Sequence, residues 1–504
     1  MNFEKRIKKL GNKKLDAIVP KLYSQHKKKN ISCWCKVLIP SISVCAILAV
    51  VLPVTLPLLE SLNYEQIITP TVEKLSTTPS TRYMSKSTYD SYKKFSGEFV
   101  SLIMETNNQK QVSMGISIPD AYINFAILAA TSEGAIKDDI FSLLQLNTYN
   151  ELKTAVLEIL DVAATSYFQT YSGKTFGGLN YNSIWLNPKH ISLTPKNEDL
   201  YKDLADVFDL SVFYDVPTTD KVTKYLNDVA INGLQVPKIS LNDESPSAAI
   251  NMSTYTYMDC FDSEIAKINK SAYLSGKTKM DYFLNDEIIV ANYINSVSKR
   301  KLYEGCGFVG SYIELEYNDI SFFLPDQNKS PRSILEDVLL DNYSPRTYNL
   351  NYVENNQEIN FETQTHEVTI KAPYFTLENN LVLEKEHLQT ILPNIASGGA
   401  LNKLATLKTG DSLTLEALHQ NSIMNFDYDG FYSTSVTYTD LIPGAPLEPP
   451  YERYELILNR PYVFKIDQHV LIDGKYDVVD GKYDIKKIPL IIGEIVDPHY
   501  IPRI

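Results

Sequence analysis

The chain has 504 residues with a net charge of −13, 44% hydrophobic residues, 25 Pro, 20 Gly and 5 Cys. This composition excludes collagen, low-complexity disorder and small disulfide-stapled proteins, and the length allows about three domains. The negative charge argues against a nucleic-acid-binding protein, and the modest hydrophobic content argues against a transporter with many membrane spans.

The charge is divided unevenly along the chain. Residues 1–36 contain ten Lys and one Arg against Glu4 and Asp16, which gives +9 and leaves −22 for the remaining residues. An uncharged, mostly apolar run of 23 residues, 37–59, follows this basic segment. About 20 apolar residues are enough to cross a hydrocarbon core about 30 Å thick. We therefore expect a transmembrane helix over residues 37–59.

Positive charge flanks this apolar run on one side, so the basic tail 1–36 is expected in the cytosol. The chain is then a single-pass type II membrane protein whose carboxyl-terminal part is extracellular or in the secretory lumen. The alternatives are a cleaved signal peptide, which would make the protein secreted, and a buried core helix. Residues 60–96 are rich in Ser, Thr, Tyr and Lys without a hydrophobic period, and we interpret them as an exposed stalk.

From residue 97 onward the hydrophobic pattern is typical of a folded domain. Helical spacing predicts helices over 119–134, 152–168, 220–234 and 381–392. Strand-like segments are 180–186, 287–294, 311–317, 319–325, 422–428, 432–439, 453–458, 461–466 and 488–496. Because helices gather early and strands late, without regular alternation, we expect the α+β class with large mixed sheets.

Sequence motifs for catalysis or metal binding are missing. The sequence contains no H-E-x-x-H, G-x-S-x-G, C-x-x-C or Walker motif, and its seven His are far apart. Gly305–Gly310 spells G-x-G-x-x-G, but a strand pattern follows it, whereas a dinucleotide site needs a helix there. We expect no enzymatic activity, no cofactor and no metal. Cys260 and Cys306 either pair in an oxidising lumen or remain buried thiols.

Six segments, in the same order along the chain, resemble motifs of one family. They are Ser117 to Leu146, Asn227 to Ile239, Tyr312–Tyr317 with Ile320–Asp326, Ile370–Leu377, Leu456–Ile466 (LILNRPYVFKI) and Ile491–Pro498 (IIGEIVDP). Each motif is weak alone, but together they resemble the serpin family over residues 97–504. The resemblance implies large mixed and antiparallel β-sheets, about nine helices and an exposed reactive-centre loop, here about residues 430–455.

The resemblance also implies suicide inhibition of a serine-type endopeptidase. In serpins the protease cleaves the loop and forms an acyl-enzyme, and the freed strand inserts into the central sheet with the trapped protease attached. The sequence alone supports an insertable segment, because Ser433–Thr439 is uncharged and prone to form a strand. The ordinary interpretations are that Gly430 is a turn glycine and that this segment is an edge strand.

The resemblance assigns roles to individual positions. The loop hinge comprises Asp429, Gly430, Phe431, Ser433, Ser435 and Thr437. The loop from Gly430 to Pro461 is several residues longer than is usual in the family. Counting from Gly430 places the scissile bond near Gly444–Ala445, or near Leu447–Glu448 if the extra residues precede the cleavage point. Ser117, Asn251 and His419 match the polar residues that pin the sheet opening, although His419 is one residue out of register with Gly430.

Two features of the loop bear on its activity. Alternate residues of a strand face the same side of the sheet, and in the inserted strand this places the Phe431 ring on the inner side. Fitting a large ring there costs about 1–3 kcal/mol and would slow insertion. A non-inhibitory serpin-fold binding or surface-interaction protein is therefore the alternative. No Lys or Arg occurs between Gly430 and Glu452, which favours an elastase-like or subtilisin-like protease over a trypsin-like one, unless Arg453 is used. The repeat DGKYD at 473–477 and 480–484 predicts an inserted hairpin.

Overall fold

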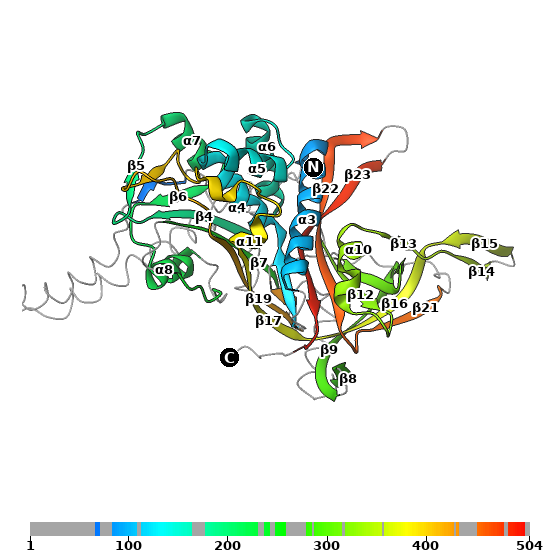
Figure 1. Ribbon diagram of the computed structural model, residues 1–504. Coiled ribbons are helices and arrows are strands. Elements are labelled where there is room, and N and C mark those ends of the chain that lie inside the picture. The colour runs from blue at the N-terminus through cyan, green and yellow to red at the C-terminus, as the bar shows by residue number, and fades with distance from the viewer. Residues whose placement is uncertain are drawn as a thin grey trace, which may run out of the picture. The chain divides into compact units, whose positions relative to one another are not determined.

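Residues 65–504 form one of the two units into which the chain divides, and Figure 1 shows its helices and strands. The computed structural model describes residues 66–70, 83–107, 112–163, 177–229, 236–241, 247–258, 279–284, 287–314, 318–354, 357–427, 430–432, 451–477 and 482–498. The expected cytosolic tail 1–36 and transmembrane segment 37–59 lie outside these ranges. Within them, no helix combines the length and the hydropathy that crossing a membrane requires.

The described residues contain eight α-helices, against about nine expected, and most of them precede the long strands. They are α3 (Lys86–Thr106), α4 (Ile118–Thr131), α5 (Gly134–Leu143), α6 (Tyr149–Ala163), α7 (Glu198–Asp206), α8 (Thr219–Val229), α10 (Leu335–Leu339) and α11 (Lys385–Leu388). Figure 1 shows α4, α5 and α6 on one side of a broad sheet and α8 on its other side. The helices predicted near 119, 152 and 220 are confirmed as α4, α6 and α8.

Helix α3 corrects the boundary that we placed after residue 96. It begins after Ser85, whose hydroxyl oxygen accepts a hydrogen bond from the backbone N–H of Thr88 and so caps the helix. Tyr92, Phe95 and Phe99 follow at helical spacing and are fully buried. The end of the expected stalk is therefore the first helix of the domain. Its apolar stripe is hard to see in the sequence because Ser, Lys, Gly and Glu separate the three aromatic residues.

A seven-stranded sheet forms the centre of the domain. Its order is β1 (Gln66–Ile68), β6 (Leu210–Phe213), β4 (Gly177–Leu186), β7 (Ser247–Met258), β20 (Gly430–Tyr432), β19 (Ala417–Asp427) and β17 (Phe375–Glu384). Strands β4 and β7 are antiparallel, as are β19 and β17. Strand β1 also lies within the expected stalk, which adds a second part of that segment to the folded domain.

The helix predicted over 381–392 is wrong for most of its length. Leu381 and Leu383 are buried members of β17, and Val382 between them is paired with His419 of β19. Helical structure is confined to α11 and the turn after it. A short run of apolar residues fits a helix or a strand equally well, and here the ten-residue ladder with β19 decides for the strand.

An eight-stranded sheet packs against the central sheet. Its order is β13 (Tyr343–Pro345), β10 (Tyr303–Gly305), β11 (Phe308–Glu314), β12 (Asn318–Pro325), β22 (Tyr462–Asp477), β23 (Lys482–Ile495) and β3 (Met114–Ser117), with β2 (Tyr83–Met84) beside β22. Aromatic rings join the two sheets: Phe426 stacks on Phe375 at 5.5 Å and meets Phe322 edge-on at 5.6 Å. Such pairs add stability beyond the area that they bury.

Two smaller groups of strands complete the structure. A four-stranded sheet has the order β21 (Arg453–Ile457), β16 (Thr365–Pro373), β9 (Glu287–Lys301) and β8 (Lys279–Leu284). Two two-stranded sheets pair β14 (Tyr348–Glu354) with β15 (Gln357–Thr363) and β5 (Ile191–Leu193) with β18 (Ala405–Leu407). The hairpin predicted from the DGKYD repeat is confirmed, because β22 and β23 remain paired out to Asp477 and Lys482.

Candidate functional site

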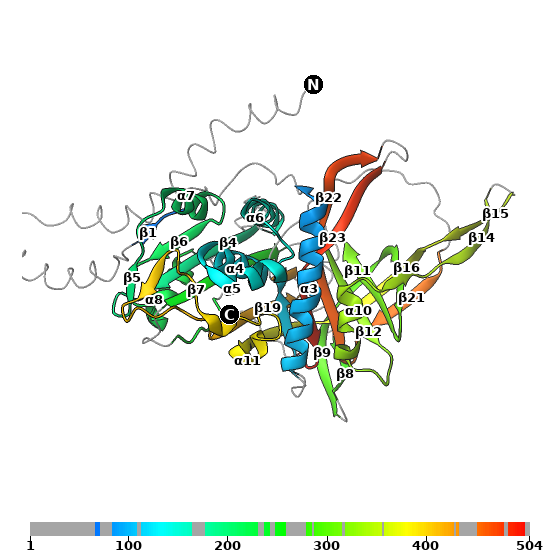
Figure 2. The same cartoon turned by 45° about the horizontal axis from the view of Figure 1, so that its top comes forward.

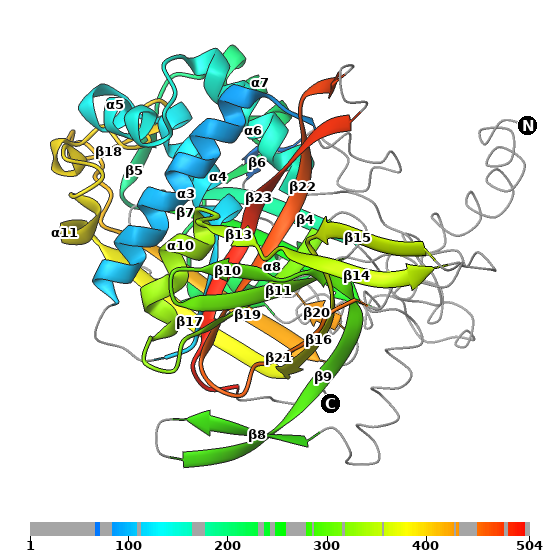
Figure 3. The ribbon, with the colours of Figure 1, turned by 90° about the vertical axis from the view of Figure 1, so that its right-hand side faces the viewer.

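The start of the expected reactive loop is a strand of the central sheet. Strand β20 forms a tight hairpin with β19, in which Gly430 pairs with Asp427 and Phe431 pairs with Phe426. On its other edge Phe431 pairs with Tyr257 of β7. The hinge therefore lies between β7 and β19, antiparallel to both (Figure 3). Asp429, Ser433, Ser435 and Thr437 lie outside the described residues, as do Gly444 and Ala445.

Strand β20 fills one end of the space between two much longer strands. β7 has 12 residues and β19 has 11, whereas β20 has three. Within the described ranges, no strand pairs with the β7-facing edge of β19 along residues 417–424. We call these facing edges of β7 and β19, beyond β20, the slot. Eight residues of strand span about 26 Å at about 3.3 Å per residue, so the slot has the length for one further strand.

A polar clasp holds the central sheet to the eight-stranded sheet beside the slot. Gln420 of β19 binds the backbone of Ser117 twice: Ser117 N donates to Oε1 at 3.0 Å, and Nε2 donates to the Ser117 carbonyl oxygen at 2.6 Å. Gly115 N donates to Asn379 Oδ1 at 2.9 Å, and Ser422 Oγ donates to the same oxygen at 2.9 Å. Side chains of β17 and β19 thus satisfy the outer edge of β3, which would otherwise expose unpaired backbone groups.

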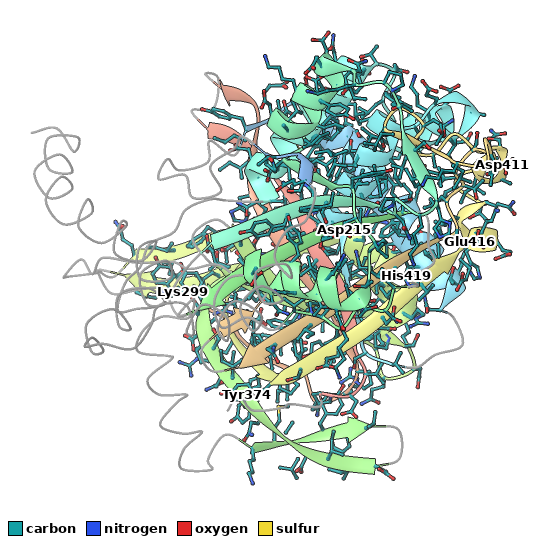
Figure 4. The ribbon with its side chains drawn as sticks, turned by 90° about the vertical axis from the view of Figure 1, so that its left-hand side faces the viewer. Asp215, Lys299, Tyr374, Asp411, Glu416 and His419 are labelled. Carbon is teal, nitrogen blue, oxygen red and sulfur yellow. The ribbon has the colours of Figure 1, made fainter. Side chains whose placement is uncertain are left out.

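The three polar residues predicted to pin the sheet opening have different outcomes. Ser117 lies in the clasp and is buried, although its Oγ has no hydrogen-bond partner among the described atoms. Asn251 lies on β7, where its backbone is opposite Asn182, and its side chain is not described. His419 is corrected: its side chain is exposed on β19, and Gln420 makes the contacts instead (Figure 4). A one-residue shift moves a strand residue to the opposite face.

The opposite face of the slot is covered near its middle by the chain that follows α8. Asn421 Nδ2 donates to the carbonyl oxygen of Lys238 at 2.5 Å. The same segment is tied back to the start of α8, because Leu241 N donates to Thr219 Oγ1 at 3.0 Å. A strand that enters the slot must therefore pass beneath this segment. Sequence reasoning missed Gln420, Ser422, Asn379 and Asn421, since isolated polar residues in strands carry no signal of their partners.

The far end of the expected loop returns to the four-stranded sheet. β21 pairs in parallel with β16, and Arg453 Nε lies 2.8 Å from Glu367 Oε1. Just before it, the ring of Tyr451 lies 4.9 Å from Lys299 Nζ (Figure 4 labels Lys299). The described chain thus ends in the central sheet at Tyr432 and resumes at Tyr451, two residues before β21 of the four-stranded sheet.

The clasp makes a testable contribution to stability. Replacing Gln420 by Ala removes two hydrogen bonds and leaves buried backbone groups of Ser117 without partners, so unfolding should become easier by about 1–3 kcal/mol. The matched control is His419→Ala on the neighbouring exposed position, which should change stability by less than about 0.5 kcal/mol. The measurement is the urea midpoint of each variant. Equal midpoints for the two variants would contradict this assignment.

The expectations about metal and cofactor sites concern the rest of the domain. Among the side chains that the structure describes, no group of three or more His, Cys, Asp or Glu is placed to hold a metal ion. The G-x-G-x-x-G segment is the turn between β10 and β11, with Gly307 at φ +83°, and no helix begins there. Cys306 is exposed on this turn, while Cys260 lies outside the described residues.

Comparisons with known proteins agree with this architecture. No protein-family model and no curated protein matches the sequence. Among solved structures, the thermophilic serpin tengpin in its native state matches with a TM-score of 0.56 at 14% identity, over 82% of this chain and 95% of that chain. Serpin48 of the insect Tenebrio molitor matches with a TM-score of 0.53 at 15% identity, over 81% and 98%. The complex of thyroxine-binding globulin with thyroxine matches with a TM-score of 0.53 at 10% identity, over 81% and 99%.

At these identities the likeness concerns the fold and leaves the activity open. The α+β class and the large mixed sheets expected from the sequence are confirmed. The chain has the serpin fold.

Proposed function

We propose that this chain inhibits a serine-type endopeptidase as a suicide substrate. The observation that carries the proposal is β20, three residues already seated between β7 and β19 at the mouth of the slot. The uncharged segment 433–439 follows β20 directly in the sequence. If the pairing of β20 continues, Ser433, Ser435 and Thr437 will lie opposite Met424, Ser422 and Gln420 in turn.

The energetics favour insertion once the loop is cut. A strand in the slot gains backbone hydrogen bonds on both edges, and at about 1 kcal/mol net for each bond the gain is on the order of 10 kcal/mol. Residues directly opposite each other in a sheet share a face, and Met424 on the inner face is buried. Small side chains at 433, 435 and 437 would fit this face without the overpacking that larger ones cause.

The chemistry belongs to the protease. Its active-site serine attacks the carbonyl carbon of the scissile bond, forms an ester with the loop and releases the amine end with a proton. The part of the loop attached to β20 is then free to enter the slot and carries the ester-bound protease away from the loop's re-entry point. Insertion has to be faster than hydrolysis of this ester. The chain itself contributes the loop that is cleaved and the strand that inserts.

The nature and place of the target follow from the sequence. With no Lys or Arg between Gly430 and Glu452, an elastase-like or subtilisin-like protease fits the loop better than a trypsin-like one. The +9 segment and the apolar run 37–59 support a type II membrane protein with its serpin-fold domain outside the cytosol. The proposed protease would then be extracellular or in the secretory lumen.

A second candidate function rests on Phe431. It is already seated between Phe426 and Tyr257, next to the aromatic layer between the two large sheets, and a large ring at this end of the slot would slow the repacking that insertion of the following residues needs. Slow insertion would let the ester hydrolyse and would make the chain a substrate. A non-inhibitory binding protein is then the alternative, and thyroxine-binding globulin with its bound thyroxine is a solved structure of this fold with such a role.

The test is whether the chain traps a protease covalently. The full chain is mixed with an elastase-type and a subtilisin-type protease and analysed by denaturing gel electrophoresis. Inhibition predicts a complex that survives SDS. Proteases blocked beforehand at the active-site serine are the control and should give no complex. Cleavage of the loop without any complex would support the binding protein.

A further inference from the structure

The β14–β15 hairpin projects from the body of the domain and is the most exposed element described (Figure 2). Its seven residue pairs run from Tyr348 with Thr363 to Glu354 with Gln357. At about 3.3 Å per residue it is about 20 Å long. Strand pairing in the described residues joins β14 and β15 to each other alone, so neither strand is used to extend a larger sheet.

The two faces of this hairpin differ. Leu350 is buried on one face, and Tyr352 and Phe361 form an edge-on ring pair there at 6.5 Å. We call the other face the outward face: it comprises Asn349, Asn351, Val353, Glu358, Asn360 and Glu362, and all six side chains are exposed. Val353 is 67% exposed between polar neighbours. A single exposed apolar residue is common on protein surfaces, so the polar and charged side chains of the outward face carry the argument.

The base of the hairpin is tied to the point where the reactive loop re-enters the fold. Glu452 N donates to Tyr348 Oη at 2.9 Å, and Tyr348 Oη donates to the Thr365 carbonyl oxygen at 2.9 Å. The Tyr348 ring also packs on that of buried His366 with centroids 4.6 Å apart. The hairpin and the loop therefore start from one fixed point, between β14 and β21.

From this point the hairpin and the loop have similar reach. Six peptide steps separate Ala445 from Tyr451, which span at most about 20 Å. A protease bound at Gly444–Ala445 is therefore held within about 20 Å of the base of the hairpin. This distance is about the length of the hairpin itself. A whole protease domain is wider than this distance, so a protease bound at this bond comes within reach of the projecting hairpin.

The hairpin itself carries charge of one sign, whereas basic residues lie at its base, where Arg453 pairs with Glu367 and Lys299 lies beside Tyr451. The sequence contains no Lys or Arg between Arg346 and Lys371, whereas Glu354, Glu358, Glu362 and Glu367 are acidic. Glu358 and Glu362 lie on the outward face, two exposed carboxylates four residues apart. An acidic face beside a binding loop attracts a partner with basic residues next to its active-site cleft, and such attraction acts mainly on the rate of encounter.

We propose that the outward face of the β14–β15 hairpin is a second docking surface for the target protease, and that it selects a protease with a basic rim around its active site. This inference takes its partner from the proposed function. It adds that recognition is divided: the loop fits the specificity pocket, and the hairpin contacts the surface beside it. The hairpin takes no part in the insertion step.

The experiment measures binding without chemistry. A cationic elastase-type protease, with its active-site serine replaced by alanine, is titrated against the full chain by surface plasmon resonance at low and at physiological salt. The variants are Glu358→Gln with Glu362→Gln, and the charge reversal Glu358→Lys with Glu362→Lys. The matched control is Asp138→Asn with Asp199→Asn, two exposed carboxylates on α5 and α7, which Figure 1 shows at the other end of the domain.

The neutralised hairpin should associate about three- to ten-fold more slowly at low salt, the reversed hairpin more slowly still, and the control as fast as the unchanged chain. The difference should shrink as salt rises. Equal association rates for hairpin and control variants, or no binding of the cationic protease, would overturn the docking surface. If binding depends on the hairpin but active protease forms no covalent complex, the docking surface stands and the inhibitory function fails.

Discussion

Replacing Thr437 by Arg should turn the chain from an inhibitor of its target protease into a substrate. In the continued pairing of β20, position 437 lies opposite Gln420, whose amide already fills the inner face against Ser117. A guanidinium there would be buried without a partner, which costs several kcal/mol and removes much of the drive for insertion. The number of inhibitor molecules consumed for each protease molecule trapped should rise at least about ten-fold.

The matched control is Thr434→Arg, which lies opposite Ile423 and so on the other face of the inserted strand. It should raise this stoichiometry much less, and both variants should be cleaved at the rate of the unchanged loop. The measurement is residual protease activity against the ratio of chain to protease, with the covalent complex quantified on denaturing gels. Equal stoichiometries of inhibition for the two variants would show that the strand does not enter in the register of β20.

Replacing Lys465 by Met should cause the largest loss of stability of any single change considered. Lys465 of β22 is fully buried, with Nζ 2.5 Å from Asp341 Oδ1 and 3.2 Å from Asp467 Oδ2. The Lys465 ammonium also donates to the hydroxyl oxygen of Tyr343 at 3.3 Å. Removing one partner of a buried ion pair leaves the other charge without compensation and costs about 3–5 kcal/mol. The urea midpoint should fall accordingly.

Two further variants distinguish loss of the ion pair from loss of packing. Lys202→Met on the exposed face of α7 is the control and should change stability by less than about 0.5 kcal/mol. Adding Asp467→Leu to Lys465→Met removes the orphaned carboxylate and should restore part of the loss. No restoration would show that the lysine acts through its methylene groups alone.

The same cluster predicts how its stabilising effect depends on pH. Burial raises the pKa of Asp341, but Lys465 and Lys93 outweigh burial and hold this pKa at about 2. Because the folded-state pKa is below the unfolded value of about 3.9, the contribution is present above pH 4 and is lost as pH falls towards 2. Burial raises the pKa of Asp467, and Lys465 offsets this in part. The Lys465→Met variant should therefore lose less stability than the unchanged chain between pH 4 and 2.

Much of the architecture could be predicted because it depends on strong local patterns and ordered motifs. The helix at 119–134 is apolar on nearly all sides, and the late strands alternate or form continuous apolar runs. The first helix was missed because its three buried rings are separated by Ser, Lys and Gly. The end of β17 is predicted as a helix because the run Leu381–Leu383 fits both periods, and its long-range ladder with β19 decides for the strand.

Little of the candidate site could be predicted beyond the place where one strand begins. Strand β20 between β7 and β19 does begin at Gly430, but the hinge roles of the residues around it stay predictions. The clasp was assigned to His419, one residue from Gln420, and a single-residue error in register reverses the face of a strand. Lys465 and Asp467 pair with each other in an otherwise ordinary strand, and nothing local indicates that Lys465 also pairs with Asp341, 124 positions away.

Intact mass spectrometry of the full chain mixed with an active elastase-type protease tests strand insertion most directly. We expect a denaturation-resistant species whose mass is that of the protease plus the chain up to the cleaved bond, near Gly444, with the remaining fragment released. Free protease together with two chain fragments, and no such species at any ratio, would contradict it.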